Sequence, residues 1–178
     1  MHEAATTRLG ELERGDGAWR LRFVRELPHA PDRVWRALTD PAELSEWFPT
    51  SIDGERRAGA PLTVTFKEDK APPFEGTMLA FDPPRLMEFR WGADLLRFEL
   101  EATEDGTRLT LYDTLDERGK AARDAGGWHT CLDLLDRLLA GLRPGDEPPP
   151  TDWRDVQPLY ARSFGPEASS IGPPEGFE

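Results

Sequence analysis

Apolar and polar residues alternate in two short runs near the start of the chain. The runs cover residues 8–14 and 18–27, and the tripeptide Gly15-Asp16-Gly17 separates them. Residues of this kind tolerate positive φ, and between two alternating runs they favour a tight reversal of the chain. In the second run, large apolar residues take every second position and arginines stand between them. The pattern predicts a β-hairpin whose second strand is buried on one face.

The spacing of apolar residues then becomes helical over residues 31–38 and 41–48. Pro31 and Pro41 stand at the first position of each stretch, where proline removes no intrahelical hydrogen bond. Asp40 comes immediately before the second stretch, where its side chain can cap a helix. Each stretch carries a narrow apolar stripe that contains tryptophan and leucine. Two short helices in succession are therefore predicted.

Alternation with a period of two returns in the middle of the chain and continues through six short runs. The runs cover residues 52–57, 62–66, 74–81, 85–91, 96–101 and 108–115. Clusters of Gly, Pro and Asp separate several of them, and such clusters are typical of turns. Closely spaced alternating strands with short turns predict an antiparallel meander that has one face toward water.

Helical spacing dominates the stretch from Glu117 to Leu142. From Trp128 onward, leucines recur every three or four residues and form a wide apolar stripe. Gly126 and Gly127 each weaken a helix by about 1 kcal/mol relative to alanine. We therefore expect a long helix that either begins near Gly127 or bends there.

These patterns divide the chain into an N-terminal lead with a hairpin strand (1–17), an α+β domain (18–143) and a C-terminal extension (144–178). Consecutive prolines predict a stiff spacer at the start of the extension. Four apolar residues at helical spacing then predict a docking helix, although Pro158 should kink or break it. The last dozen residues are rich in Gly, Pro and Ser, and we expect them to be loose. The four docking residues are Trp153, Val156, Tyr160 and Phe164.

Composition and charge narrow the class of protein. The chain has 178 residues, and a hydrophobic share of 38% is enough for a packed core without disulfides. The 34 acidic residues outnumber the 22 basic ones and give a net charge of −12, which repels nucleic-acid phosphates and anionic lipid. Because no basic stripe compensates for this charge, we expect no nucleic-acid partner.

The sequence also predicts a cytoplasmic location. The N-terminus lacks the apolar segment of a signal peptide. No run reaches the roughly 18 apolar residues that a membrane span needs, so we expect no membrane insertion. Cys131 is the only cysteine, so an intramolecular disulfide is impossible and a Cys-rich zinc site is excluded.

The order of these elements, together with several short motifs, resembles the SRPBCC (START-like, helix-grip) superfamily. Within it, the chain is most similar to the branch named for activators of the heat-shock protein 90 ATPase. The likeness covers about Trp19 to Leu142. The motifs are residues 30–41, 43–48, 74–77, 81–85 and 89–92, and Gly127-Trp128 followed by Leu132 and Leu135.

This resemblance implies an α+β helix-grip fold, in which a curved antiparallel sheet surrounds a long C-terminal helix and two short helices follow the first strand. It also implies an internal pocket for hydrophobic ligands. It implies no shared catalytic residues and no cofactor, because the superfamily mixes lipid carriers, hormone receptors, cyclases and proteins of unknown role. The eukaryotic activators have a further large N-terminal domain that makes much of the chaperone contact, so the resemblance supports the fold more than chaperone contact.

Residues that carry reactive chemistry are few and scattered. His2, His29 and His129 lie in unrelated regions, and no metal site is expected from them. Cys131 has no neighbouring base in the sequence that would activate it as a nucleophile, so we interpret it as a small buried residue. Some charged strand residues could place charge near a pocket mouth, but charges that alternate with apolar residues on strands normally face water, and we expect these to do so: Glu75, Glu88, Arg90 and Asp113.

Bulky residues on a curved sheet can leave a hollow against the long helix, and pockets for small molecules are lined mainly by such side chains. A filled core would use the same residues, and the cavity is the alternative that we expect. His129 either orients a polar group of the ligand at the cavity wall, shuttles a proton, or is a structural histidine. The predicted lining residues are Trp47, Phe48, Phe66, Phe74, Met87, Phe89, Trp91, Phe98, Trp128, His129, Leu132 and Leu135.

Three functions follow from this interpretation. The leading hypothesis is non-catalytic binding of a small hydrophobic or amphipathic molecule in the cavity. The second is a cyclase or dehydratase type of enzyme that uses the same cavity and one proton-moving group such as His129. The third is a protein-interaction or co-chaperone domain, and a homodimer is one form that such an interaction could take.

Overall fold

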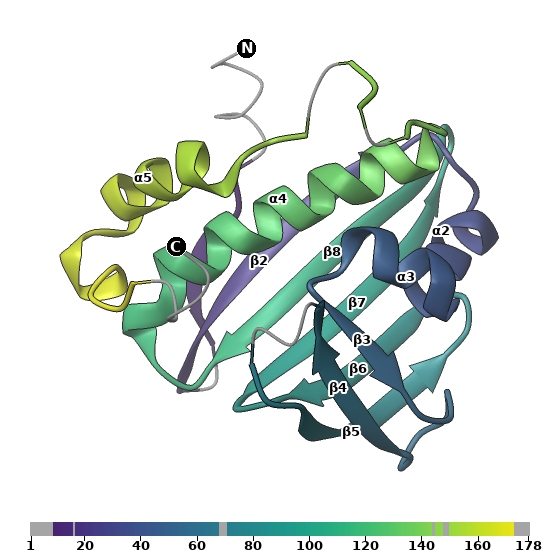
Figure 1. Ribbon diagram of the computed structural model, residues 1–178, viewed down its shortest axis with the longest axis horizontal. Helices are drawn as coiled ribbons and strands as arrows, with labels where there is room; N and C mark the ends of the chain where they lie inside the picture. Colours follow the sequence, from purple (N-terminus) through teal and green to yellow (C-terminus); the bar gives the residue numbers. More distant parts are fainter. Residues whose placement is uncertain (1–8, 16, 68–70, 144, 148–149, 173–178) are drawn as a thin grey trace.

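The computed structural model describes residues 9–15, 17–67, 71–143, 145–147 and 150–172. Eight strands form one curved antiparallel sheet in the order β1-β2-β8-β7-β6-β5-β4-β3, and a long helix, α4 (Ala121–Leu139), lies across one of its faces (Figure 1). This arrangement confirms the predicted α+β helix-grip fold. The strands are β1 (Glu11–Gly15), β2 (Ala18–Leu27), β3 (Thr50–Asp53), β4 (Pro61–Phe66), β5 (Phe74–Asp82), β6 (Leu86–Trp91), β7 (Asp94–Thr103) and β8 (Gly106–Leu115).

The predicted hairpin is formed by β1 and β2, which pair in register from Gly15 opposite Ala18 to Glu11 opposite Arg22. Strand β2 also pairs with β8 along its other edge. Its first half alternates as expected, because Leu21 is fully buried while Arg20 and Arg22 are more exposed. Further along, Arg25 is buried and Val24 is exposed. The hairpin therefore belongs to the main sheet and extends one of its edges.

Two short helices, α2 (Pro31–Thr39) and α3 (Pro41–Trp47), follow β2 as predicted. The Asp40 carboxylate accepts a hydrogen bond from the backbone N–H of Ala42 and caps α3. The indole N–H of Trp47 donates to the carbonyl of Ala37 at 2.9 Å, which ties α3 to α2. In Figure 1 both helices lie beside the C-terminal end of α4, on the same side of the sheet.

The strand meander is also present, and the largest difference concerns β3. This strand covers Thr50–Asp53 instead of residues 52–57. The chain leaves the sheet at Gly54, whose φ is +141°, a value that residues with a side chain rarely adopt. The guanidinium of Arg56 then donates to the carbonyl of Ile52 and stabilises the turn.

Helix α4 begins before Gly127, within the stretch of helical spacing that starts at Glu117. A 3₁₀ turn at Arg118–Lys120 leads directly into α4 at Ala121, so both glycines lie inside the helix. The surroundings of Gly126 explain why a glycine is suitable there. A Cβ atom added to Gly126 would lie 3.1 Å from the Cβ of Gln157, so the lack of a side chain lets the two segments approach closely.

The C-terminal extension packs on the domain through α5 (Trp153–Phe164), which lies along the N-terminal half of α4 (Figure 1). Val156 and Tyr160 are buried in this contact. The helix continues through Pro158, which was expected to kink or break it. Proline removes one backbone hydrogen bond from the helix, and the packing of the buried face of α5 on α4 offsets this loss. Of the predicted loose tail, residues 173–178 lie outside the described residues, whereas the backbone N–H of Ile171 bonds to the carbonyl of Gly119.

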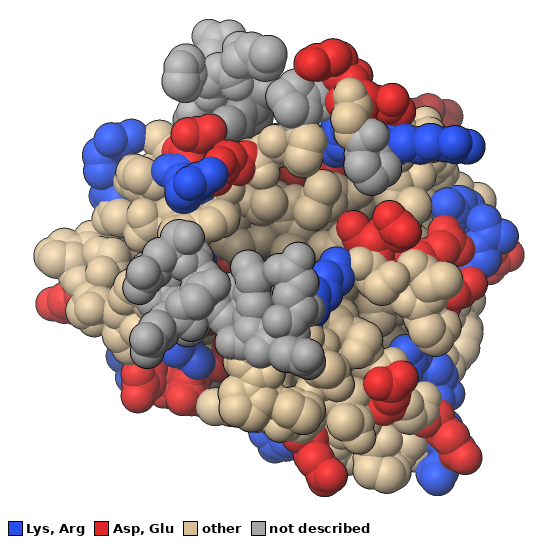
Figure 2. Space-filling model, viewed as in Figure 1, with Lys and Arg blue, Asp and Glu red and all other residues tan. Residues whose placement is uncertain are grey.

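Charged side chains lie mainly around the edge of the face seen in Figure 2, while uncharged residues occupy much of its centre.

Among the described residues, no helix combines the length and the apolar character that crossing a membrane requires.

Candidate functional site

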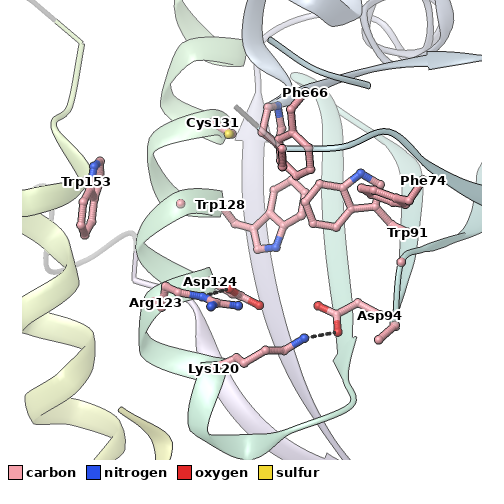
Figure 3. A pocket seen from close by; sticks show the side chains of 15 residues that line it. Phe66, Phe74, Trp91, Asp94, Lys120, Arg123, Asp124, Trp128, Cys131 and Trp153 are labelled. Atoms are coloured by element: carbon pink, nitrogen blue, oxygen red, sulfur yellow. Dashed lines mark hydrogen bonds and ion pairs between the residues drawn. The ribbon is translucent and has the colours of Figure 1, made fainter. Parts of the chain in front are cut away.

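A pocket of about 400 Å³ opens between the N-terminal half of α4 and the part of the sheet formed by β4, β5, β6 and β7. Aromatic and small residues make up most of its surface, and charged residues gather at one end (Figure 3). The lining residues are Pro49, Phe66, Ala71, Phe74, Trp91, Gly92, Ala93, Asp94, Lys120, Arg123, Asp124, Gly127, Trp128, Cys131 and Trp153.

Four rings, which we call the aromatic wall, form the apolar side of the pocket: Phe66, Phe74, Trp91 and Trp128. The Trp91 ring lies at the centre, with its centroid 5.4 Å from Trp128, 5.9 Å from Phe74 and 6.2 Å from Phe66. These separations are typical of favourable aromatic pairs. The indole N–H of Trp91 also donates to the hydroxyl of Thr50 at 3.3 Å. The wall is therefore rigid, because each ring is fixed by at least one other ring.

Helix α4 contributes two further lining residues beside Trp128, which are Gly127 and Cys131. Gly127 faces the open space, and a Cβ atom added there would meet no atom within 4 Å. Cys131 lies one turn further along the helix, and burial raises the pKa of its thiol to about 12. The thiol therefore stays protonated near neutral pH and behaves as an apolar part of the lining.

Ion pairs occupy the polar end of the pocket. The Lys120 ammonium contacts Oδ1 of Asp94 at 2.9 Å and also contacts Asp116, one turn before it in the chain. Burial alone would lower the pKa of Lys120, but these contacts raise it above its ordinary value, so the ammonium stays charged. Arg123 Nε donates to Oδ1 of Asp124 at 2.8 Å.

A third carboxylate, that of Asp113 on β8, lies behind this end of the pocket. Asp113 is fully buried, and its Oδ2 accepts the indole N–H of Trp128 at 2.8 Å. Burial raises the pKa of Asp113 well above its ordinary value, and the charges of Asp94 and Asp124 raise it further. The expectation that Asp113 faces water is therefore wrong, because its position on β8 puts it on the sheet face that α4 covers.

A known protein family matches a region of the chain that extends well beyond the pocket residues. The sequence model described as activator of Hsp90 ATPase homolog 1-like protein matches residues 28–140. The chain belongs to this family. The matched region runs from the loop before α2 to the end of α4, and it confirms the resemblance found in the sequence. No curated protein matches the chain in sequence.

Solved structures show the fold of this Hsp90 ATPase activator-like chain in several bacteria. A conserved protein of unknown function from Enterococcus faecalis, EF2215, has a TM-score of 0.74 at 16% identity, with 91% of this chain and 93% of that chain covered. CalU16 from Micromonospora echinospora has a TM-score of 0.67 at 20% identity, with 87% and 94% covered. The protein encoded by gene BPP1335 of Bordetella parapertussis has a TM-score of 0.63 at 26% identity, with 87% and 88% covered. The first two likenesses, both below 25% identity, show the fold alone.

Some of the predicted lining residues lie in the pocket, and others lie in the packed core. Phe66, Phe74, Trp91 and Trp128 line the pocket. The other apolar ones lie in the packed interior, where, for example, Phe89 stacks on Phe98 at 6.3 Å between ring centroids. Those residues are Trp47, Phe48, Met87, Phe89, Phe98, Leu132 and Leu135.

His129 lies on a different side of α4 from the pocket, beneath α5. The Tyr160 hydroxyl accepts the backbone N–H of Gly10 at 2.8 Å and also lies 2.8 Å from Nδ1 of His129. On the other side of the ring, Nε2 faces the Asp133 carboxylate at 3.5 Å, and a neutral imidazole with its proton on Nε2 accepts the Tyr160 O–H at Nδ1. These contacts connect α4, α5 and the segment before β1, a structural role for the histidine.

Three site residues were not predicted from the sequence, namely Asp94, Lys120 and Asp124. The strand pattern nevertheless contains a signal for the two acids on strands, Asp94 and Asp113. Asp94 lies two residues before Leu96 on β7, and Asp113 lies two residues after Leu111 on β8. Period-two spacing therefore places both acids on the same face as these buried leucines. An acidic residue at an inward strand position is uncommon and marks a polar group under α4.

Proposed function

We propose that the chain binds a small hydrophobic or amphipathic molecule in the pocket and releases it unchanged. The pocket itself is the observation that supports this proposal most directly. Its volume of about 400 Å³ and its four-ring aromatic wall resemble sites for small molecules, which enclose roughly 300–1,000 Å³ and have mostly apolar linings. The ion pairs at one end favour a ligand that is apolar along most of its length and polar at one end.

The test is a fluorescence titration with N-phenyl-1-naphthylamine, an uncharged dye that brightens in apolar sites. We expect saturable binding to the unmodified chain. Gly127→Leu should weaken it at least about tenfold, a loss of about 1.4 kcal/mol, because the new side chain extends into the pocket. Ala140→Leu is the matched control, since it adds the same side chain to an exposed position about 20 Å further along the helix axis.

Equal dye binding by the two leucine variants would contradict the proposal, and so would the absence of saturable binding to the unmodified chain. Circular dichroism melts of both variants show whether each of them folds. Native mass spectrometry of the purified protein would then identify any organic molecule that the pocket retains.

The other two hypotheses have less support from the site. The enzyme hypothesis relied on His129 as the proton-moving group, but this side chain faces Tyr160 and is not part of the pocket lining. The family description motivates the co-chaperone hypothesis, which a binding assay with purified heat-shock protein 90 would test. A cytoplasmic location remains a prediction from the sequence.

A further inference from the structure

Three acidic side chains from separate elements converge at the polar end of the pocket. Asp94 begins β7, Asp113 lies near the end of β8, and Asp124 is in the first turn of α4. One carboxylate oxygen from each lies within 4.8 Å of those from the other two, and we call this group the carboxylate cluster. Oxygens that share one Mg²⁺, Mn²⁺ or Ca²⁺ ion lie about 2.1–2.6 Å from it, which allows oxygen–oxygen separations up to roughly 5 Å.

Each carboxylate of the cluster is held by a donor from the protein. Lys120 contacts Oδ1 of Asp94, Arg123 Nε donates to Oδ1 of Asp124, and Trp128 Nε1 donates to Oδ2 of Asp113 (Figure 3 shows the first of these contacts). Donors of this kind fix the orientation of metal ligands in proteins and thereby strengthen metal binding. The cluster is therefore oriented before any ion arrives.

Asp113 supplies an independent reason to expect an occupant. Its side chain is fully buried, and Oδ1 has no hydrogen-bond partner among the described residues. A buried carboxylate oxygen without a partner costs free energy, because it has lost its water without gaining a replacement. Either a proton or a cation would remove this cost.

The balance of charge favours a cation with two positive charges. With Asp113 ionised, the cluster and Asp116 together make four carboxylates, whereas the ion pairs described in this region use two cations, Lys120 and Arg123. We propose that Asp94, Asp113 and Asp124 bind a hard divalent cation at the polar end of the pocket. Ligands that are all carboxylate oxygens suit Mg²⁺, Mn²⁺ or Ca²⁺ better than zinc or copper.

The site has an entrance, since Asp94 and Asp124 belong to the lining of the open pocket. Three protein ligands leave coordination positions that water can fill, as is usual for Mg²⁺ and Ca²⁺. None of the three ligands is a histidine or a cysteine, the residue types from which a metal site was judged in the sequence. The proposal does not depend on the organic ligand and can be tested without it.

The probe is Mn²⁺, titrated into the full chain near neutral pH and followed by the electron paramagnetic resonance signal of the free ion. We expect saturable binding of one ion per chain that Ca²⁺ or Mg²⁺ displaces. Asp113→Asn and Asp124→Asn should each weaken binding at least about tenfold. Glu46→Gln removes one negative charge from an exposed position on α3 and should leave the affinity unchanged.

A second measurement locates the ion without any substitution. Bound Mn²⁺ should broaden the indole N–H resonance of Trp128, the donor to Asp113, more strongly than that of Trp35, which packs against Phe81 away from the pocket. No saturable binding up to about 10 mM, above the weakest range of natural calcium sites, would overturn the proposal. Binding that Asp113→Asn leaves intact, or equal broadening of the two indoles, would overturn it as well.

Discussion

Two adjacent glycines on α4 have opposite surroundings. Gly126 lies under α5 and packs against its residue Gln157, whereas Gly127 faces the open pocket. The sequence shows only two residues that weaken a helix. In the structure, the first allows α4 and α5 to approach, and the second keeps space free beside Trp128.

We expect Gly127→Ala to raise the free energy of unfolding by about 1 kcal/mol, because alanine favours the helix and its methyl group meets no neighbour. Gly126→Ala is the matched comparison and should give a smaller gain or a loss, since its methyl group would press on Gln157. Urea denaturation measures both changes. An equal gain for the two variants would show that α5 is not packed on Gly126.

At the scale of single elements, the alternation of residues predicted most strands and helices to within a few positions. The start of α4 could not be predicted in this way. A helix that contains two glycines is stable here because α5 covers it, and that contact joins segments about 30 residues apart. The same limit applies to the site: the spacing in β7 and β8 can show that Asp94 and Asp113 point inward, but only the folded sheet brings Asp124 to them.

The docking of α5 on α4 can be tested through Tyr160. We expect Tyr160→Phe to lower the free energy of unfolding by about 1–3 kcal/mol near neutral pH, because the Gly10 N–H and His129 Nδ1 both lose their partner. Thermal or urea denaturation of the two chains measures the difference. A fully stable variant would mean that the hydroxyl makes no net contribution.

The pH dependence of that difference follows from the ionisation of the phenol. Burial raises the pKa of Tyr160 from about 10 to about 12, with Arg25 opposing and Asp133 adding to the shift. Between these two values the unfolded chain loses the proton first, so the contribution of Tyr160 is complete below pH 10 and declines as the pH rises toward 12. The gap in stability between wild type and Tyr160→Phe should therefore narrow across this window.

At the scale of the whole molecule, the C-terminal extension completes the fold. The family match ends at residue 140, yet α5 buries Val156 and Tyr160 against the matched region. The sequence could predict a docking helix from its apolar stripe. It could not predict where that helix docks, because its contacts with Gly126 and His129 of α4 join positions about 30 residues apart that only the folded chain brings together.

We expect removal of residues 151–178 to lower the free energy of unfolding by roughly 3 kcal/mol or more, because two large buried side chains and their covered surface are lost. A melt followed by circular dichroism measures the change. The full chain should unfold in one transition, whereas two separate transitions would mean that the extension is an independent unit.

The Trp128 side chain belongs both to the pocket and to the proposed ion site. Its ring belongs to the aromatic wall, and its N–H donates to a buried carboxylate of the proposed ion site. A molecule that shifts the ring also shifts this donor, so the energies of the two binding events are linked. Thermodynamic reciprocity then requires that an ion and an organic guest change each other's affinity by the same factor, whichever arrives first.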